Sequence, residues 1–272
     1  MLGILACFPA SGQTADSQAR FEVASVKVAP PDSRGWSNYC GGGPGSKTPG
    51  RYRCENAILA ALLVDAYSMQ WYQIPESVRS DSTKYDIEAT IPEGATRKQI
   101  QFMMQNLLAE RFKLVCHFEK KEIRAYDLTV AKGGSKLKEA TPGPPPPPLT
   151  KLTRDADGFP IMQNGPGTYM TIAVPRTRIV GSYASLERMV AMLTAQLGGP
   201  VTDSTGLTGK YDFVLTYAMV GAGGPSAITD ADQSAPSIFE ALPVQLGLKL
   251  EPKKVPVDII VIDHVEKNPT EN

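Results

Sequence analysis

Two histidines, His117 and His264, are the only imidazole side chains in the 272 residues, and each follows a residue that could act with it in catalysis. Cys116 precedes the first and Asp263 precedes the second. Nucleophilic catalysis often uses a histidine together with a cysteine or an aspartate. Both pairs lie in alternating apolar segments, which predict strands, and neighbours on a strand point to opposite faces. The members of each pair therefore cannot act together, and each histidine needs a partner from elsewhere.

A Lys-Tyr-Asp motif occurs twice and supplies the other catalytic candidates, Asp86 and Asp212. Each motif begins a strand-like segment, so its carboxylate either accepts hydrogen bonds from a neighbouring turn or forms one of two equivalent acidic sites. The first interpretation is favoured, because duplicated residues usually record duplicated packing. The second leaves His264, Asp86 and Asp212 as candidates for a hydrolytic site, with a serine that the sequence does not identify.

Other motifs of catalysis and cofactor binding are missing from the sequence. It contains no G-x-S-x-G, H-E-x-x-H or C-x-x-C, and the stretch Gly45–Arg51 has arginine where a phosphate-binding loop needs lysine. We therefore expect no cofactor and no metal ion. Lysine plus arginine and aspartate plus glutamate number 28 each, so the chain has no basic excess for nucleic acid. No apolar run approaches the ~20 residues of a membrane-spanning helix.

The cysteines suggest an oxidising compartment. Cys40 and Cys54 flank a stretch rich in glycine and proline, which is not expected to form regular structure. A disulfide between them would restrict the unfolded chain and stabilise the fold by roughly 3 kcal/mol, and such bonds persist outside the cytosol. Two unrelated thiols are the alternative. Cys116 is left without a partner, and its position in an alternating segment predicts a buried, unreactive thiol.

Residues 1–20 resemble the end of a secretory signal segment. An apolar run from Leu2 to Phe8 leads into Ala10 and Gly12, the small residues before a cut at Gln13. A disordered tail is the alternative, and Cys7 offers a weaker context for a lipid anchor. We expect an exported protein, periplasmic or extracellular.

Apolar residues recur at helical spacing in four segments, which predict four helices. The first follows Asn56 as N-cap, the second starts at Thr96 with Gln99 in a capping box, the third covers Leu186 to Leu197, and the fourth starts near Pro236 with Ser237 and Glu240 in a capping box. Pro243 lies inside the fourth and should kink or shorten it.

Two strand-like segments follow each predicted helix: 70–74 and 84–90, 113–118 and 125–130, 200–203 and 210–216, 248–251 and 257–263. Lys-Lys pairs at 120–121 and 253–254 are the predicted turns of the second and fourth groups. The pattern predicts an α+β fold made by tandem duplication of helix-strand-strand units, with helices packed on an antiparallel or mixed sheet. Two pseudo-equivalent halves, 21–140 and 171–272, would be joined by a proline-rich linker at 141–170.

Several segments together resemble a large soil-associated family of exported acidobacterial proteins: FEVASVK, LLAERFKL, YDLTVAKGGSKLKE, VTDSTGLTGKYDF and QLGLKLEPKKVPVDIIVIDHVEKNPTEN. The resemblance covers residues 21–272. It implies an extracytoplasmic sensing or binding role, since the family's domain also occurs behind membrane metallopeptidase-type sensor regions. The chain departs from that pattern at Cys40, Cys54 and Pro243. Residues 241–262 also look like the short periplasmic modules of secretins and TonB-dependent receptors, which bind partner proteins.

The sequence therefore favours an exported binding or interaction module for an unknown protein or small-molecule ligand outside the cytoplasm. Sheet edges and the surface between the halves are the expected contact areas. The alternative is a hydrolase of esters, peptides or glycosides, with its site in the cleft between the halves.

Overall fold

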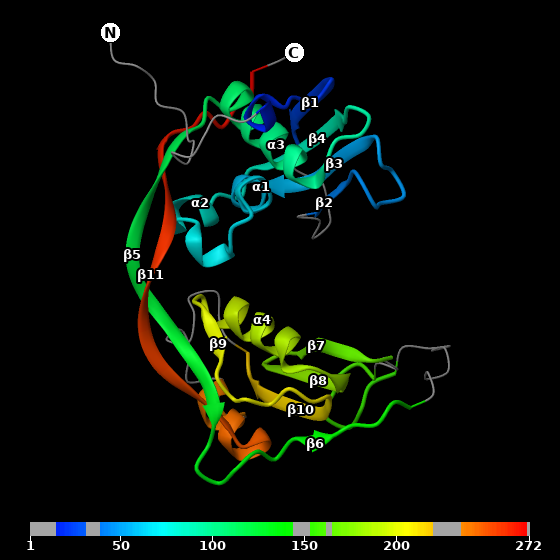
Figure 1. Ribbon diagram of the computed structural model, residues 1–272, viewed down its shortest axis with the longest axis vertical. Helices are drawn as coiled ribbons and strands as arrows, with labels where there is room; N and C mark the ends of the chain where they lie inside the picture. Colours follow the sequence, from blue (N-terminus) through cyan, green and yellow to red (C-terminus); the bar gives the residue numbers. More distant parts are fainter. Residues whose placement is uncertain (1–14, 31–38, 144–152, 162–164, 220–234, 271–272) are drawn as a thin grey trace. The chain divides into compact units, whose positions relative to one another are not determined.

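The structure is a computed structural model that describes residues 15–30, 39–143, 153–161, 165–219 and 235–270 (Figure 1). It is a mixed α+β protein, as predicted, and this part of the chain contains five α-helices and three sheets. The chain divides into two compact units, residues 1–121 with 256–272 and residues 122–255. Residues 1–14 of the predicted signal segment, with Cys7, Ala10, Gly12 and Gln13, lie outside the described residues, as do the prolines at 144–148.

The first unit is built on a four-stranded antiparallel sheet in the order β1-β4-β3-β2. Its strands are β1 (Val23–Val28), β2 (Tyr39–Gly42), β3 (Arg51–Ile58) and β4 (Lys84–Thr90). Strands β2 and β3 show that the expectation of no regular structure between Cys40 and Cys54 is wrong. The two strands can approach because Gly42 has a φ of 114° and a Cβ there would meet the Arg51 carbonyl oxygen.

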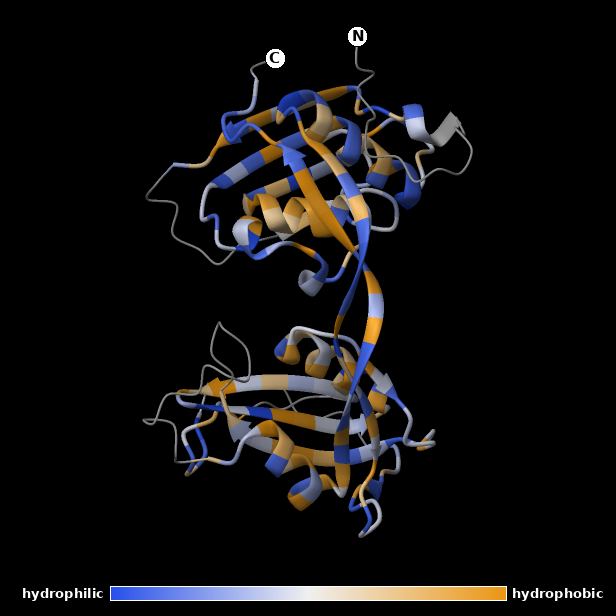
Figure 2. Ribbon diagram, turned by 90° about the vertical axis from the view of Figure 1, so that its left-hand side faces the viewer, coloured by the Kyte–Doolittle hydropathy of each residue, from blue (hydrophilic) through white to orange (hydrophobic). Residues whose placement is uncertain are grey.

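Helices α1 (Leu59–Tyr67) and α3 (Arg97–Arg111) contact each other and enclose the core of this unit with the sheet. The predicted capping box of α3 is confirmed: Thr96 Oγ1 accepts from the Gln99 N–H, and the Gln99 side chain accepts from the Thr96 N–H. Apolar residues gather along the helices and their side of the sheet (Figure 2).

Two predictions about this unit are wrong. Helix α1 begins after Ile58 and not after Asn56, which lies in a β-bulge with a φ of 50°. Residues 70–74 do not form a strand, but contain the 3₁₀-helix η2 (Trp71–Gln73), and α2 (Glu76–Arg79) follows it. The short helix forms here instead of a strand because the Gln70 and Gln73 side chains cap its first turn.

The second unit contains another four-stranded antiparallel sheet, in the order β6-β10-β8-β7. Its strands are β6 (Lys138–Glu139), β7 (Gly167–Ala173), β8 (Arg176–Ala184) and β10 (Tyr211–Ala218). Helix α4 (Leu186–Leu197) buries its predicted apolar side chains, Met189 and Leu193 among them, in the core of this unit. It ends at Gly198, which has a left-handed φ of 63°.

The last helix is interrupted at Pro243, as expected. Ser237 and Glu240 form the predicted capping box of α5 (Ile238–Ala241), and the chain then widens into the π-helical turn η4 (Leu242–Leu246). Proline has no N–H to donate, so the regular α-helical ladder cannot continue through it.

Two long strands, β5 (Val115–Val130) and β11 (Leu248–His264), run side by side and continue from one unit into the other (Figures 1 and 2). The short strand β9 (Val201–Asp203) pairs with β5 in parallel. The predicted Lys-Lys turns are therefore wrong. Lysine does not favour the left-handed conformation that tight turns require. Instead, Lys120 binds Asp258 at 2.9 Å and Lys253 binds Asp127 at 2.6 Å across the two strands.

The two four-stranded sheets have matching layouts. In each, a hairpin leads directly into a helix, β2-β3 into α1 and β7-β8 into α4, and the next long strand of the sheet pairs beside the hairpin. This correspondence supports a tandem duplication, which stays a prediction. The two units differ from the predicted halves, because the chain passes between them within β5 and β11 and not within 141–170.

Candidate functional site

Asp86 and Asp212, two of the three catalytic candidates, hold corresponding backbone bulges. Asp86 Oδ1 accepts a hydrogen bond from the Asn56 N–H at 2.8 Å, and Asp212 Oδ1 accepts one from the Tyr183 N–H, also at 2.8 Å. Asn56 and Tyr183 have left-handed φ values of 50° and 43°, and each lies three residues before the start of a helix. Both carboxylates therefore act on the backbone of the adjacent strand.

The third candidate, His264, lies on β11 in the first unit with an exposed side chain, and its Nε2 is 3.8 Å from Glu266 Oε1. No hydrogen bond or ion pair in the described part of the chain joins His264 to Asp86 or Asp212. The three residues are not brought together within either unit, because Asp212 belongs to the second unit and the other two to the first.

The other histidine forms a pair that sequence reasoning missed. His117 Nδ1 lies 2.9 Å from Asp263 Oδ2, and its Nε2 lies 3.3 Å from Glu119 Oε1. The hydrogen bond to Asp263, followed by the one to Glu119, raises the pKa of the His117 imidazole. Asp263 is on β11 and His117 on β5, so the pair depends on the pairing of two distant strands. Alternation of residues along each strand carries no signal for it.

The cysteines within the described residues are disulfide-bonded. The predicted bond between Cys40 and Cys54 joins residues directly opposite each other on β2 and β3, and Cys54 is fully buried. The expectation that Cys116 is an unpaired thiol is wrong, since it is disulfide-bonded. Its Sγ also accepts a hydrogen bond from the Tyr67 hydroxyl at 3.6 Å. Cys116 is therefore unavailable as a nucleophile.

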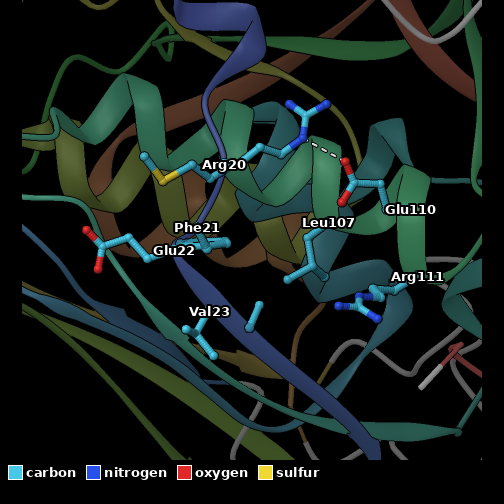
Figure 3. A pocket seen from close by; sticks show the side chains of 9 residues that line it. Arg20, Phe21, Glu22, Val23, Leu107, Glu110 and Arg111 are labelled. Carbon is cyan, nitrogen blue, oxygen red and sulfur yellow. Dashed lines mark hydrogen bonds and ion pairs between the residues drawn. The ribbon is translucent and has the colours of Figure 1, made fainter. Parts of the chain in front are cut away.

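A groove of about 530 Å³ lies in the first unit between β1 and α3 (Figure 3). The consecutive residues Arg20 to Ala24 line one side, and Met103, Leu107, Glu110 and Arg111 of α3 line the other. Because five consecutive residues border the groove, the backbone of this segment lines it as well as the side chains.

The backbone along this groove has an unpaired edge. Strand β1 is the outermost strand of its sheet and pairs with β4 alone in the described residues. Ala29 donates to the Lys84 carbonyl at 2.8 Å in the register of the β1-β4 pair. Since bonding alternates along an antiparallel pair, Ala24 and Val26 direct their N–H and C=O groups to the free edge.

Apolar side chains form the floor of the groove and charges form its rim. Val23 is 65% exposed, whereas Met103 and Leu107 are buried with one side toward the groove. Arg20 Nε binds Glu110 Oε1 at 2.6 Å beside Leu107, and Glu22 lies on the opposite side (Figure 3).

The approach to β1 is held on α3 by a buried polar side chain. The Asn106 amide donates to the carbonyl oxygens of Ser17 and Ala19 at 3.0 and 2.8 Å. This anchors η1 (Ala15–Gln18) and sets the path of the chain into the groove. No local pattern in the sequence signals this role of Asn106, because the contact joins segments almost 90 residues apart.

Sites for metal ions and membrane spans are not found in the described residues. No group of three or more histidine, cysteine, aspartate or glutamate side chains is placed to hold a metal ion. None of the helices in this part of the chain has the length and apolar character needed to cross a membrane.

Comparison with known proteins identifies a family whose function is unknown. Residues 60–265, about three quarters of the chain, match a family model described as "Protein of unknown function (DUF3738)". No curated protein matches the chain, and no solved structure matches it. The matched region covers most of the described helices and strands, including both long strands. The chain belongs to the DUF3738 family.

Proposed function

We propose that this protein is an exported binding module that takes an extended polypeptide segment in the groove between β1 and α3. The observation that carries the proposal is the free backbone edge of β1 beside an apolar floor. An added strand would pair with the N–H and C=O groups of Ala24 and Val26, which gives affinity without sequence preference. Its alternate side chains would enter the groove against Val23 and Leu107, which gives specificity.

The charges of the rim favour the same kind of ligand. Arg20 and Glu110 are each about half exposed, with 49% and 54% of their side chains accessible. They can exchange their mutual ion pair for bonds to a ligand at little cost, because exposed ion pairs contribute little stability. An unpaired edge strand presents N–H and C=O groups with which another chain can pair.

Export is part of the proposal, and the disulfide chemistry supports it. The Cys40–Cys54 bond and the bonded Cys116 fit an oxidising compartment. The resemblance to exported, soil-associated acidobacterial proteins and to secretin and TonB-receptor modules agrees with a sensing or partner-binding role. Fractionation of a host that expresses the chain, with alkylation of unreacted thiols, should find the oxidised protein outside the cytoplasm. Recovery of a fully reduced protein from the cytoplasm would contradict export.

The hydrolase alternative has less support. Asp86 and Asp212 are engaged by backbone N–H groups, and His264 has an exposed glutamate beside it. No serine hydroxyl is bonded to either histidine in the described ranges. Turnover of an ester, peptide or glycoside that His264→Ala abolishes at unchanged melting temperature would revive the hydrolase.

The binding proposal is tested with a display library of random dodecapeptides selected on the full chain. We expect enrichment of peptides with apolar residues at alternate positions, and we measure the affinity of one such peptide by fluorescence polarisation. Ala24→Pro removes an N–H from the free edge and no bond from the β1-β4 ladder, so it should weaken binding at least ten-fold. Val23→Asp should do the same by placing a charge on the apolar floor.

Val214→Asp is the matched control, since Val214 is 50% exposed on β10 in the other unit. It should leave peptide affinity unchanged. Circular dichroism must show that each variant keeps the wild-type fold. The proposal fails if no peptide is enriched, or if an enriched peptide binds the folded Ala24→Pro and Val23→Asp variants as tightly as wild type.

A further inference from the structure

The second unit contains a cavity that differs in character from the groove. It has a volume of about 470 Å³ and lies where the start of α4 meets the start of β7. Its lining includes Arg188, Lys210, Ser185 and Thr168, and none of the lining residues is acidic. This site and the groove belong to different units, so an inference about one does not depend on the other.

The two cations of the cavity have no carboxylate partner among the residues that the structure describes. Arg188 and Lys210 are exposed, and neither forms an ion pair with a carboxylate in the described residues, unlike Arg178 and Lys253 of the same unit. The acidic groups closest in sequence are not lining residues, although Asp212 bonds the backbone of Tyr183, which is one. The other such group is Glu187, in the first turn of α4.

The helix that begins at this cavity leaves its N-terminal N–H groups without a side-chain cap. Ser185 is the N-cap residue of the twelve-residue helix α4, yet its hydroxyl makes no capping hydrogen bond. The hydroxyls of Thr96 and Ser237 do cap α3 and α5. The partial positive charge of the α4 terminus therefore remains available to an anion.

A buried hydroxyl without a partner lies in the same lining. Thr168 is 8% exposed, and its Oγ1 forms no hydrogen bond. Leaving a buried polar group unsatisfied costs about 1–3 kcal/mol. Thr168 faces Gly181 across the β7-β8 pair, so no neighbouring side chain at that position supplies a partner. A ligand oxygen in the cavity would satisfy it.

We infer that this cavity binds a tetrahedral oxyanion of the phosphate class, either free phosphate or the phosphoryl group of a monoester. Arg188 and Lys210 supply two positive charges for a dianion, with charge-assisted hydrogen bonds. Ser185, Thr168 and the first N–H groups of α4 supply neutral donors around the remaining oxygens. A carboxylate would use fewer of these donors, so phosphate should bind more tightly than acetate.

The test is titration of the full chain with inorganic phosphate, phenyl phosphate and acetate by isothermal calorimetry at low ionic strength. We expect saturable binding of phosphate, weaker binding of acetate, and affinity that falls as salt is added. Tighter binding of phenyl phosphate than of phosphate would assign the site to an esterified group, and weaker binding would assign it to free phosphate.

Variants locate the bound anion. Arg188→Gln and Lys210→Gln change exposed side chains and should each weaken phosphate binding at least ten-fold, whereas Lys254→Gln, an exposed lysine elsewhere in this unit, should have no effect. Thr168→Val should weaken binding several-fold while leaving the melting temperature unchanged or higher. The inference is overturned if phosphate shows no saturable binding, or if Arg188→Gln and Lys210→Gln bind it like wild type. Loss of peptide binding in Ala24→Pro leaves this result unaffected.

Discussion

The carboxylate of Asp86 accepts the N–H of Asn56 at 2.8 Å, across a bulge in which β3 places an extra residue opposite β4. The pair of Asp212 and Tyr183 repeats this arrangement at the same distance and at the same separation from a helix. A left-handed residue in a bulge exposes an N–H that the strand ladder does not satisfy. The aspartate of each Lys-Tyr-Asp motif provides the missing acceptor and so sets the turn from strand to helix.

Asp86→Ala should destabilise the protein by about 1–3 kcal/mol, because it leaves the Asn56 N–H without its acceptor. Asp86→Asn retains a carbonyl oxygen at the same position and should recover most of this loss. Urea denaturation followed by circular dichroism measures both. Equal destabilisation by the two substitutions would show that the charge of Asp86, and not its acceptor oxygen, matters.

Asn56→Gly tests the bulge from its other side and should be neutral or stabilising. Asn56 has a φ of 50°, which glycine adopts without strain, and its side-chain Oδ1 is buried with no hydrogen-bond partner. Asn56→Ala keeps a Cβ in the left-handed conformation and should be less stable than Asn56→Gly, by about 1 kcal/mol. Denaturation midpoints in urea compare the three proteins. A glycine variant less stable than the alanine variant would contradict this account.

Local signals in the sequence predicted the helices well and the strand connections poorly. The capping boxes at Thr96 and Ser237 are formed by residues three positions apart, so their geometry is nearly complete in the sequence. The Lys-Lys turns failed because a continuous strand and a hairpin show the same alternation. Only contacts between β5 and β11, such as the ion pair of Lys120 with Asp258, distinguish a continuous strand from a hairpin.

The same limit applies to the sites. The recurrence of the Lys-Tyr-Asp motif predicts a structural role for Asp86 and Asp212, but residue spacing does not place the bulges that they hold. The groove depends on the position of β1 at the edge of its sheet. The proposed anion site depends on Lys210 and Arg188, which come from separate elements and line the same cavity. Each is a property of strand order, which alternating residues do not encode.

Arg178→Lys should destabilise the second unit by about 1–3 kcal/mol. The Arg178 guanidinium, whose side chain is 15% exposed, binds Asp155, lies 2.8 Å from Asp157 and packs 3.9 Å above the Phe159 ring. An ammonium group cannot form this planar, forked set of contacts. Urea denaturation gives the free energy of unfolding.

Arg176→Lys is the matched control for Arg178, because Arg176 reaches the same loop with a 2.6 Å bond to the Asp157 carbonyl, a long 3.7 Å ion pair with the Asp157 carboxylate and a longer ring contact. It should cost clearly less than Arg178→Lys. Equal losses in the two variants would mean that the fork geometry of Arg178 contributes nothing specific.

Asp263→Asn should lower the pKa of His117 toward its ordinary value near 6.5. The hydrogen bond to Asp263 is the main cause that raises this pKa, and Glu119 adds to it. NMR titration of the imidazole Hε1 signal, assigned with a His264→Gln variant, measures the change. The raised pKa means that stabilisation by this pair is present below pH 6.5 and is lost as the pH rises through the folded value. An unchanged His117 pKa in Asp263→Asn would remove the cross-strand pair as its cause.

Low pH should reduce the stability of the first unit, partly because Asp81 becomes protonated. The hydrogen bond from Lys267, together with the N–H and hydroxyl of Thr83, lowers the pKa of Asp81 from 3.8 to about 2. The unfolded carboxylate therefore takes up a proton before the folded one does. The stability that this group contributes, at most about 2 kcal/mol, is complete above pH 4 and is lost as the pH falls toward 2.

Asp81→Asn should remove that part of the pH dependence. The variant should be less stable than wild type at pH 6, and the difference should shrink between pH 4 and pH 2 as the wild-type carboxylate is protonated. Denaturation in urea at several pH values measures it, with Asp258→Asn as a comparison that breaks an exposed ion pair. Because Lys267 follows the end of β11 and Asp81 precedes β4, Lys267→Met should reproduce most of the effect. A constant stability difference across this pH range would mean that Asp81 contributes through packing and not through its charge.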